Sequence, residues 1–418
     1  MPTVLQIVLI SMAVIALLGV VLEDVIHVNK AKVTLFLGTL AWILLFVFHG
    51  NGADSAQVIE GFKENISEIA GLWLFLVSAM TFVAYLNKKG MIENLIYLFL
   101  PKQISERALL FLTAVFCFVF SSLADNITAT LVSVTLILSL NLSAKKTIRF
   151  ATLVVFAVNS GGVALITGDV TTLMIFLAEK VSIVDLLMLS IPAFLAVLVL
   201  ATMLSRGMTN VVKVNLHRTD VRGVDVAIAC IFLTTIIGTI VGNVLFNIPP
   251  VLTFLFGLSA MFLVARFFNE DIDSDPILEY IRVIEFETLL FFLGILLLVG
   301  MLKEIEVLDS LVLMYEVLPP FLANYLMGIL SAAIDNVPLT AALLKAGIEM
   351  SEPDWLGLTY AVGVGGSLLV IGSAAGIVAM SKVNGLTFGS YVRYAGYLLI
   401  SYTLGYAAVY YLARFALA

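Results

Sequence analysis

The chain has 418 residues, of which 61% are hydrophobic and only 12% are charged, and its formal net charge is −7. Soluble globular domains average about 45–50% apolar and about 25% charged residues, so this composition excludes an ordinary soluble protein. Apolar runs long enough to cross a bilayer as helices, about 17–25 residues, recur along the chain, whereas the short alternating segments of a membrane β-barrel are missing. The sequence therefore predicts an all-α polytopic membrane protein.

Ten crossings are predicted, at about 4–22, 33–49, 69–87, 148–180, 183–205, 225–246, 250–266, 285–302, 357–381 and 391–413. The crossings at 148–180 and 357–381 contain glycine pairs, which favour an interrupted helix in each. Residues 54–68 carry glutamates on one helical face and predict a separate interfacial helix. The stretches 92–101 and 307–317 predict short helices that flank the two hairpins described next.

Two further apolar stretches, about 107–140 and 319–348, carry the pairs Asp125-Asn126 and Asp335-Asn336 near their middles. Each stretch has room for two short helices but is flanked by charged residues on both sides. We interpret both as re-entrant hairpins that enter and leave on one face, with Asp-Asn at the tip. Pro338, directly after the second pair, favours a helix break at that point.

The same order of segments recurs in both halves: a span, a connector, a hairpin, an interrupted span and a final span. "SGGVALITGD" at 160–169 corresponds to "VGGSLLVIGS" at 364–373, so Ser373 stands where Asp169 stands. Because each half has five crossings, the second half is inverted in the membrane. The predicted domains are repeat 1 at 1–206, a cytoplasmic linker at 207–223 and repeat 2 at 224–418. Inverted repeats with broken helices are typical of secondary transporters.

Lysine and arginine set the predicted orientation, because loops rich in these residues stay in the cytoplasm. Alternating the ten crossings places 17 of the 22 Lys and Arg residues on one side, which predicts that both termini lie outside. The first hairpin then enters from the cytoplasm and the second from outside.

Only Asp125, Asp169 and Asp335 among the 29 acidic residues lie well inside apolar runs. A carboxylate at membrane depth costs roughly 2.5–3.5 kcal/mol on insertion scales, so such a residue is usually functional. No Lys or Arg is predicted near the midplane to pair with these acids. We expect this absence to disfavour a small organic anion and to favour a cation that competes with protons.

The first interrupted span supplies further oxygen ligands. In "NSGGVALITGDVTT", 159–172, unwound carbonyls and the side chains of Asn159, Asp169, Thr171 and Thr172 suit a small hard cation. The glycines expected at the helix breaks are Gly161, Gly162, Gly168, Gly365, Gly366 and Gly372. Two cysteines in apolar runs and three histidines without ligand spacing predict no cofactor.

These segments resemble the D-type bacterial Na⁺/H⁺ antiporters of the ion-transporter superfamily. The resemblance rests on "HVNKAKVTLFLGTLAW" at 27–42, "ADNITATL" at 124–131, "NSGG…GDVTTLM" at 159–174, "SAAIDNVPLTAAL" at 331–343 and "GGSLLVIGSAAGIVAM" at 365–380. It covers nearly the whole chain. One departure is Leu165-Ile166-Thr167, where the family often has Ser-Pro-Phe, and this leaves the cation preference open.

The resemblance implies a non-enzymatic carrier in the bacterial cell membrane that exchanges cytoplasmic Na⁺ or Li⁺ for external H⁺, and a homodimer. The candidate ion-binding residues are Asp125, Asn126, Asn159, Asp169, Thr171, Thr172, Asp335, Asn336 and Ser373. Sodium is expected at Asp169, Asp125, Thr171 and Thr172, with Asp169 first. Alternating access is expected to be elevator-like.

Three other functions are compatible with the same residues. A carrier of arsenite or a carboxylate from the same superfamily could use the same scaffold, and a channel would bind the cation without coupling it to protons. An intramembrane aspartyl protease also uses two buried aspartates, one of them in Gly-x-Gly-Asp. Here the run is Ile166-Thr167-Gly168-Asp169, which lacks the first glycine. The choice among Na⁺, Li⁺ and K⁺ and the proton stoichiometry stay open.

Overall fold

The computed structural model describes residues 3–21, 28–49, 55–92, 94, 101–140, 142–213, 220–267, 281 and 284–416. The described part is helical apart from two three-residue strands. Among the described residues, seven helices are long and apolar enough to cross a membrane: Lys30–Phe48, Ala56–Lys88, Glu106–Leu123, Ile183–Leu204, Gly223–Phe246, Pro250–Phe267 and Phe286–Glu304. The chain is therefore a helical, multi-pass membrane protein. Six of these seven coincide with predicted crossings, and the seventh, Glu106–Leu123, was predicted as one arm of a hairpin.

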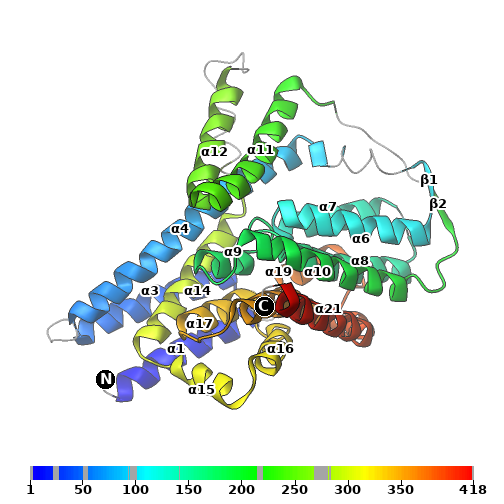
Figure 1. Cartoon of the computed structure of the whole chain (residues 1–418). Helices are drawn as coiled ribbons and strands as arrows, with labels where there is room; N and C mark the ends of the chain where they lie inside the picture. Colours follow the sequence, from blue (N-terminus) through cyan, green and yellow to red (C-terminus); the bar gives the residue numbers. More distant parts are fainter. Residues whose placement is uncertain are drawn as a thin grey trace.

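One group of long helices packs together on one side of the molecule (Figure 1). It comprises α1 (Thr3–Val21), α3 (Lys30–His49), α4 (Ser55–Lys88), α11 (Gly223–Phe246), α12 (Pro250–Phe267) and α14 (Phe286–Glu304). We call it the long-helix group. α3 and α14 approach closely because Gly38 and Gly294 face each other: a Cβ at Gly38 would lie 2.7 Å from the Gly294 carbonyl oxygen.

The predicted boundary between 54–68 and 69–87 is wrong, because α4 is one helix of 34 residues. The segment contains no proline and no paired glycine, so nothing in the sequence breaks it. Asn65, in the part predicted to be interfacial, is buried and donates to the Leu296 carbonyl on α14. The described part of this segment, residues 55–68, therefore extends the span rather than forming a separate helix.

The second group, the broken-helix group, contains the interrupted helices together with continuous helices of up to 22 residues (Figure 1). Its first part is α6 (Glu106–Leu123), α7 (Asn126–Ser139), α8 (Ala144–Gly162), α9 (Val170–Leu177) and α10 (Ile183–Leu204). Its second part is α16 (Pro320–Ser331), α17 (Asn336–Lys345), α18 (Glu352–Gly365), the 3₁₀ turn η1 (Gly366–Leu368), α19 (Ala374–Lys382), α20 (Phe388–Val392) and α21 (Ala395–Ala416). The two parts meet where α10 packs against α21 and α8 against α18.

The predicted interruptions are confirmed as helix breaks. The 107–140 stretch is two helices separated at Ala124-Asp125, and the 319–348 stretch is two helices separated at residues 332–335. The interrupted spans likewise divide into α8 and α9, and into α18, η1 and α19. A short helix, α15 (Asp309–Val317), occupies the predicted 307–317 stretch. Most of the predicted 92–101 helix lies outside the described residues.

One element was not predicted. β1 (Gln103–Ser105) and β2 (Val211–Lys213) form a two-stranded antiparallel sheet in which Gln103 pairs with Lys213. The pairing joins the segment before α6 to the segment after α10, so it ties the two ends of this five-helix unit together. Strands of three residues leave no periodic pattern in the sequence, which is why the sequence did not reveal them.

Candidate functional site

Four short helices begin at one pocket, and a predicted site residue caps each of them. Asp125 caps α7, Asp169 caps α9, Asp335 caps α17 and Ser373 caps α19. A side-chain oxygen at this position accepts a hydrogen bond from an otherwise unpaired backbone N–H, and a carboxylate there also interacts favourably with the helix dipole. The helix N-termini therefore offset part of the cost of placing three carboxylates inside an apolar protein.

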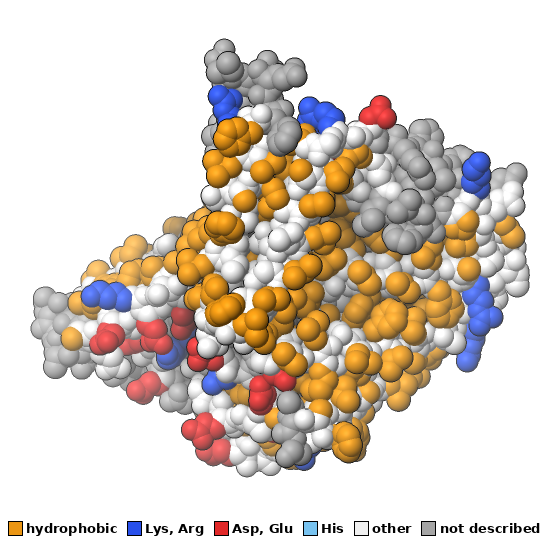
Figure 2. All heavy atoms as spheres, turned by 45° about the horizontal axis from the view of Figure 1, so that its top comes forward, with side chains coloured by type: hydrophobic (Ala, Val, Ile, Leu, Met, Phe, Trp, Pro, Cys, Tyr) orange, Lys and Arg blue, Asp and Glu red, His pale blue; other side chains and the backbone are white. Residues whose placement is uncertain are grey.

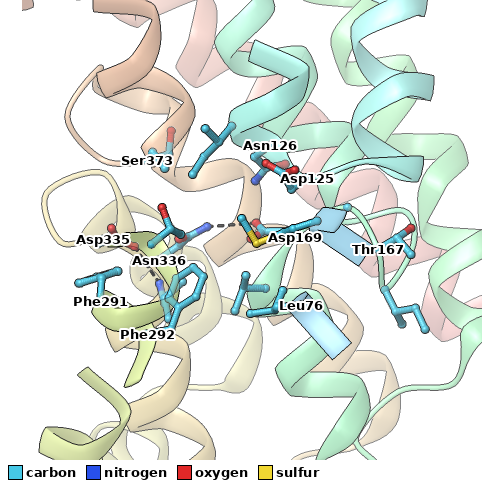
Figure 3. Close-up of a pocket in the computed structure, with 18 of the residues that line it drawn as sticks. Leu76, Asp125, Asn126, Thr167, Asp169, Phe291, Phe292, Asp335, Asn336 and Ser373 are labelled. Carbon is cyan, nitrogen blue, oxygen red and sulfur yellow. Dashed lines mark hydrogen bonds between the residues drawn. The ribbon is translucent and has the colours of Figure 1, made fainter. Parts of the chain in front are cut away.

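The pocket has a volume of about 70 Å³ and is lined by all three aspartates together with Asn126, Asn336, Thr167 and Ser373. Apolar side chains, among them Leu76, Phe291 and Phe292, complete its wall (Figure 3). This volume accommodates a few water molecules. The structure thus brings six of the nine predicted ion-binding residues to one small cavity.

Asp169 is held between the two parts of the broken-helix group. Its Oδ1 accepts from the backbone N–H of Thr171 at 3.4 Å, and its Oδ2 accepts from Asn336 Nδ2 at 3.1 Å. Figure 3 shows the Asn336 amide pointing at the Asp169 carboxylate. Asp169 is 8% exposed and Asn336 is 5% exposed, so both groups are nearly withdrawn from solvent. A residue of one hairpin tip thereby contacts the break of the opposite interrupted span.

A second contact of the same kind joins Asn159 and Ser373. Asn159 Nδ2 donates to the Val155 carbonyl on its own helix and to Ser373 Oγ at 3.0 Å. Asn159 Oδ1 is buried and has no hydrogen-bond partner among the described residues. A buried amide oxygen without a donor is costly, and a bound cation would satisfy it.

Thr171 and Thr172 are fully buried but do not line the pocket. Thr172 Oγ1 donates to the Gly162 carbonyl at 3.4 Å, across the break between α8 and α9. Among the described residues no three His, Cys, Asp or Glu side chains come together closely enough to hold a metal ion. The three aspartates therefore share a pocket without forming a three-carboxylate ligand set, and a cation there would rely on neutral oxygens as well.

The predicted break glycines permit close contact between backbones. A Cβ at Gly161 would overlap the Phe118 carbonyl of α6, and a Cβ at Gly365 would overlap the Gly328 carbonyl of α16. At Gly162, Gly168, Gly366 and Gly372 an added Cβ would lie within 3.0 Å of a neighbouring oxygen atom. The backbone of α8 therefore lies directly against the backbone of α6, and that of α18 against that of α16. This close packing is possible only because these positions lack side chains.

The expectation that no basic side chain lies among the aspartates is wrong. Lys30 Nζ is 3.7 Å from Asp335 Oδ2, and Lys30 lines the same pocket. The reason is that α3 begins at Lys30, earlier than the predicted crossing, and the lysine side chain extends along α14 with its ammonium 4.6 Å from the Phe291 ring centroid. The absence of a basic side chain can therefore no longer be used as an argument against a small organic anion as the transported substrate. Three carboxylates and one ammonium still leave the pocket with a formal charge of −2.

Glu285 adds a half-buried carboxyl group next to this pocket, at the start of α14. Burial raises the pKa of Glu285, and the nearby Asp125 carboxylate raises it further, while Thr288 and Lys30 act in the opposite direction. Sequence analysis missed Glu285 because it sits at a span end, where acidic residues are common.

A helical membrane protein in which broken helices meet at a buried acidic pocket is, by class, a secondary transporter. Comparison with known proteins specifies the family. Residues 3–365 match the citrate transporter family, CitMHS. The Na⁺/H⁺ antiporter NhaD of Alkalimonas amylolytica is 32% identical over 94% of this chain and 88% of its own length. The Vibrio cholerae NhaD is 28% identical over 92% and 87%, and Arabidopsis thaliana sodium/proton antiporter 1 is 27% identical over 93% and 69%.

The chain therefore belongs to the NhaD family of Na⁺/H⁺ antiporters, within the CitMHS group of ion transporters. This confirms the family predicted from the sequence. It also places the chain among transporters and not enzymes, which removes the intramembrane protease alternative.

Proposed function

We propose that this protein exchanges cytoplasmic Na⁺ or Li⁺ for external protons. The observation that carries the proposal is the acidic pocket at the meeting point of four capped helices, with Asp169 held by Asn336 across the two parts of the broken-helix group. Similarity to NhaD antiporters over more than nine-tenths of the chain supports Na⁺ and protons as the substrates of this pocket. Its net negative formal charge suits a cation, and its carboxylates can carry protons in place of the metal.

Asp169 is the proposed carboxylate shared by cation and proton, with Asp125 as the second. Thr171 and Thr172 would complete the sodium ligands through a modest rearrangement of the α8–α9 break, and Asn159 Oδ1 is a further oxygen without a donor. Sodium and proton exclude each other because a protonated carboxyl is a poor ligand, and a bound cation opposes protonation. Mutually exclusive binding is what couples the two flows.

The proposed architecture is two inverted repeats, 1–206 and 224–418, with a linker at 207–223. Equivalent contacts in the two halves support it. Ser121 Oγ donates to the Val158 carbonyl, and Ser331 Oγ donates to the Val362 carbonyl. The overlaps that a Cβ would make at Gly161 and Gly365 are likewise equivalent. We further propose that the α6–α7 and α16–α17 pairs are re-entrant hairpins that enter from opposite faces, within a total of ten crossings.

The protein is proposed to lie in the bacterial cell membrane with both termini outside, as a homodimer. Figure 2 is consistent with the charge asymmetry behind this orientation: Asp and Glu gather at the lower left, most visible Lys and Arg lie at the top and right edges, and hydrophobic side chains lie between. We also propose an elevator-like cycle, in which the broken-helix group moves against the long-helix group. The packing of α17 against α14 is a contact across that boundary.

The test is cation–proton exchange by the full-length protein in inverted membrane vesicles from a host that lacks its own antiporters. Adding NaCl or LiCl to respiring vesicles is expected to release protons from the lumen, reported by dequenching of a pH-sensitive dye. D169N is the matched inactive variant, because asparagine keeps a side-chain oxygen for the α9 cap and removes the charge.

D169N should accumulate to the wild-type level and give no response. Full exchange by D169N would remove Asp169 from the mechanism. Proton movement driven by citrate but not by Na⁺ or Li⁺ would replace the antiporter with a carboxylate carrier, and Na⁺ flux without proton movement would indicate a channel.

A further inference from the structure

The two hairpin tips differ at one position, and the difference changes what each aspartate can bind. Asp125 Oδ1 accepts from the Thr128 backbone N–H at 2.9 Å, and Asp125 Oδ2 accepts from the Thr128 hydroxyl at 2.7 Å. Three residues after Asp335 the chain has Pro338, which has neither an N–H nor a hydroxyl. Asp335 caps α17 through Oδ1 alone, which accepts from the Val337 N–H at 3.1 Å.

Asp335 Oδ2 is therefore left for a partner outside the hairpin, and that partner is the Lys30 ammonium at 3.7 Å. Only 16% of the Lys30 side chain and 10% of the Asp335 side chain are exposed, so water screens this pair weakly. Both residues line the pocket that holds Asp169. The cation of the pair thus lies inside the proposed transport site.

Lys30 is held there by the long-helix group. Asn29 caps α3 by accepting from the Ala31 N–H at 2.8 Å, and its amide donates to Glu287 on α14 at 2.6 Å. A lysine in the first turn of a helix is opposed by the helix dipole, so its position needs a compensating acid. Asp335 supplies it, and Glu285 lies near enough for Lys30 to lower its pKa.

The other end of α17 is also paired with the long-helix group. Lys345, in the last turn of α17, forms an ion pair with Glu68 on α4. α17 is thus joined to α3 at its beginning and to α4 at its end. The two pairs differ in one respect that an experiment can use: Asp335 lines the transport pocket, whereas Lys345 and Glu68 line a separate pocket beside α4.

We propose that Lys30 is an intramolecular cation of the transport site, which occupies Asp335 when the site is empty and is displaced from it when Na⁺ binds. The inference rests on the proposed cation exchange. The inference adds Asp335 to the sodium ligands proposed above. The ammonium and the incoming ion compete for the same Asp335 oxygen, so Lys30 sets the apparent affinity for Na⁺. Lys30 acts by competing for Asp335 and is not itself a ligand of Na⁺, because an ammonium has no lone pair to donate to a cation.

The experiment measures the apparent Kd of purified full-length protein for NaCl, from the rise of its unfolding temperature with Na⁺ concentration at constant ionic strength. This readout does not need transport activity. K30Q is expected to bind Na⁺ about tenfold more tightly than wild type, because one weakly screened competing charge has been removed. K30M, which keeps the apolar stem against Phe291, should give the same result if K30Q folds poorly.

Two matched variants separate competition from general charge and packing effects. K32Q removes an exposed lysine from the same helix turn and should leave the Kd within twofold of wild type. E68Q breaks the ion pair at the other end of α17 and should also leave the Kd unchanged, although it is expected to change the exchange rate.

A double-mutant cycle tests whether the effect passes through Asp335. K30Q should have no effect on the Kd when added to D335N, because the contested carboxylate is gone. An unchanged or weaker Na⁺ affinity in K30Q and K30M, with wild type binding Na⁺, would overturn the role of Lys30 while leaving the antiporter proposal standing. Wild-type protein that neither binds Na⁺ nor exchanges it would overturn the proposed function itself.

Discussion

At the scale of single residues, each of the three pocket aspartates caps a helix N-terminus and also lines the pocket. Asp125 and Asp169 cap α7 and α9 through backbone N–H groups of Thr128 and Thr171. Part of what makes these acids tolerable in an apolar interior is therefore structural. Substitution by asparagine retains a capping oxygen, so a loss of transport in D169N reports on ion chemistry, whereas alanine would remove both functions at once.

Glu285 gives a prediction about pH. Because the pKa of its carboxyl is raised in the folded protein, folding favours the protonated form. The stability this group contributes is fully present below its ordinary pKa and is lost as pH rises through the raised value. E285Q resembles the protonated form at every pH. It should therefore unfold at a temperature about 1–2 °C above wild type at pH 8 and at the same temperature near pH 4.

Thermal unfolding of both proteins in detergent across this pH range is the measurement. E60Q, which changes an exposed glutamate of α4, is the control and should follow wild type throughout. An E285Q protein that is destabilised at pH 8 would mean that the ionised carboxylate has a stabilising partner and that burial does not dominate.

At the scale of elements, the sequence predicted where helices are interrupted more accurately than where a helix continues without a break. Asp-Asn followed by Pro338, and glycine pairs inside apolar runs, mark backbone that cannot continue as a helix. The boundary expected before residue 69 was wrong, since amphipathic and apolar segments can share one helix when no breaker separates them. α4 continues through this boundary because its N-terminal half packs, through Asn65, on α14.

The glycines at the breaks give a second prediction. G365A adds a Cβ that overlaps the Gly328 carbonyl, which belongs to backbone and cannot rotate away. Overpacking of this kind typically costs about 1–3 kcal/mol, so G365A should lower the unfolding temperature and the exchange rate together. Thermal unfolding and vesicle exchange are the two measurements.

G357A, on the same helix, is the matched control. Its added Cβ would contact the Tyr406 ring at 3.7 Å, an ordinary van der Waals distance. It should be neutral or slightly stabilising, because alanine favours the helix over glycine by about 1 kcal/mol. Equal behaviour of the two variants would show that close approach of α18 to α16 is not required.

At the scale of the whole molecule, six of the nine residues predicted from the sequence line one pocket, but the sequence did not predict every neighbour of these residues. Asp125, Asp169 and Asp335 share the pocket as expected. Lys30 could not be placed there from its position before an apolar run, because its location depends on how α3 packs against α14 through Gly38 and Gly294. Contacts between distant helices of this kind leave no local pattern. Thr128 and Pro338, by comparison, can be read directly from the sequence once Asp125 is aligned with Asp335.

Movement between the two helix groups gives the third prediction. Glu68 of α4 and Lys345 of α17 meet across the boundary, so E68C and K345C can be joined by a short bis-maleimide. The exposed Cys230 is first replaced by serine, while Cys117 is buried. Cross-linking is expected to lower the rate of Na⁺/H⁺ exchange, measured in vesicles, at least tenfold.

Each single cysteine variant treated with the same reagent is the control and should keep its exchange activity. A cross-linked protein that exchanges at the uncross-linked rate would exclude relative sliding of α17 and α4 during transport.

The single proline after the second hairpin tip makes the two hairpins non-interchangeable. In a chain assembled from two copies of the first hairpin, each oxygen of both aspartates would accept from its own threonine, and an ammonium from the neighbouring helices would have to share one of those oxygens. Among the described residues, the second hairpin is the one whose aspartate forms an ion pair with a lysine of the long-helix group. The two otherwise repeated hairpins therefore differ in how their aspartates interact with the long-helix group.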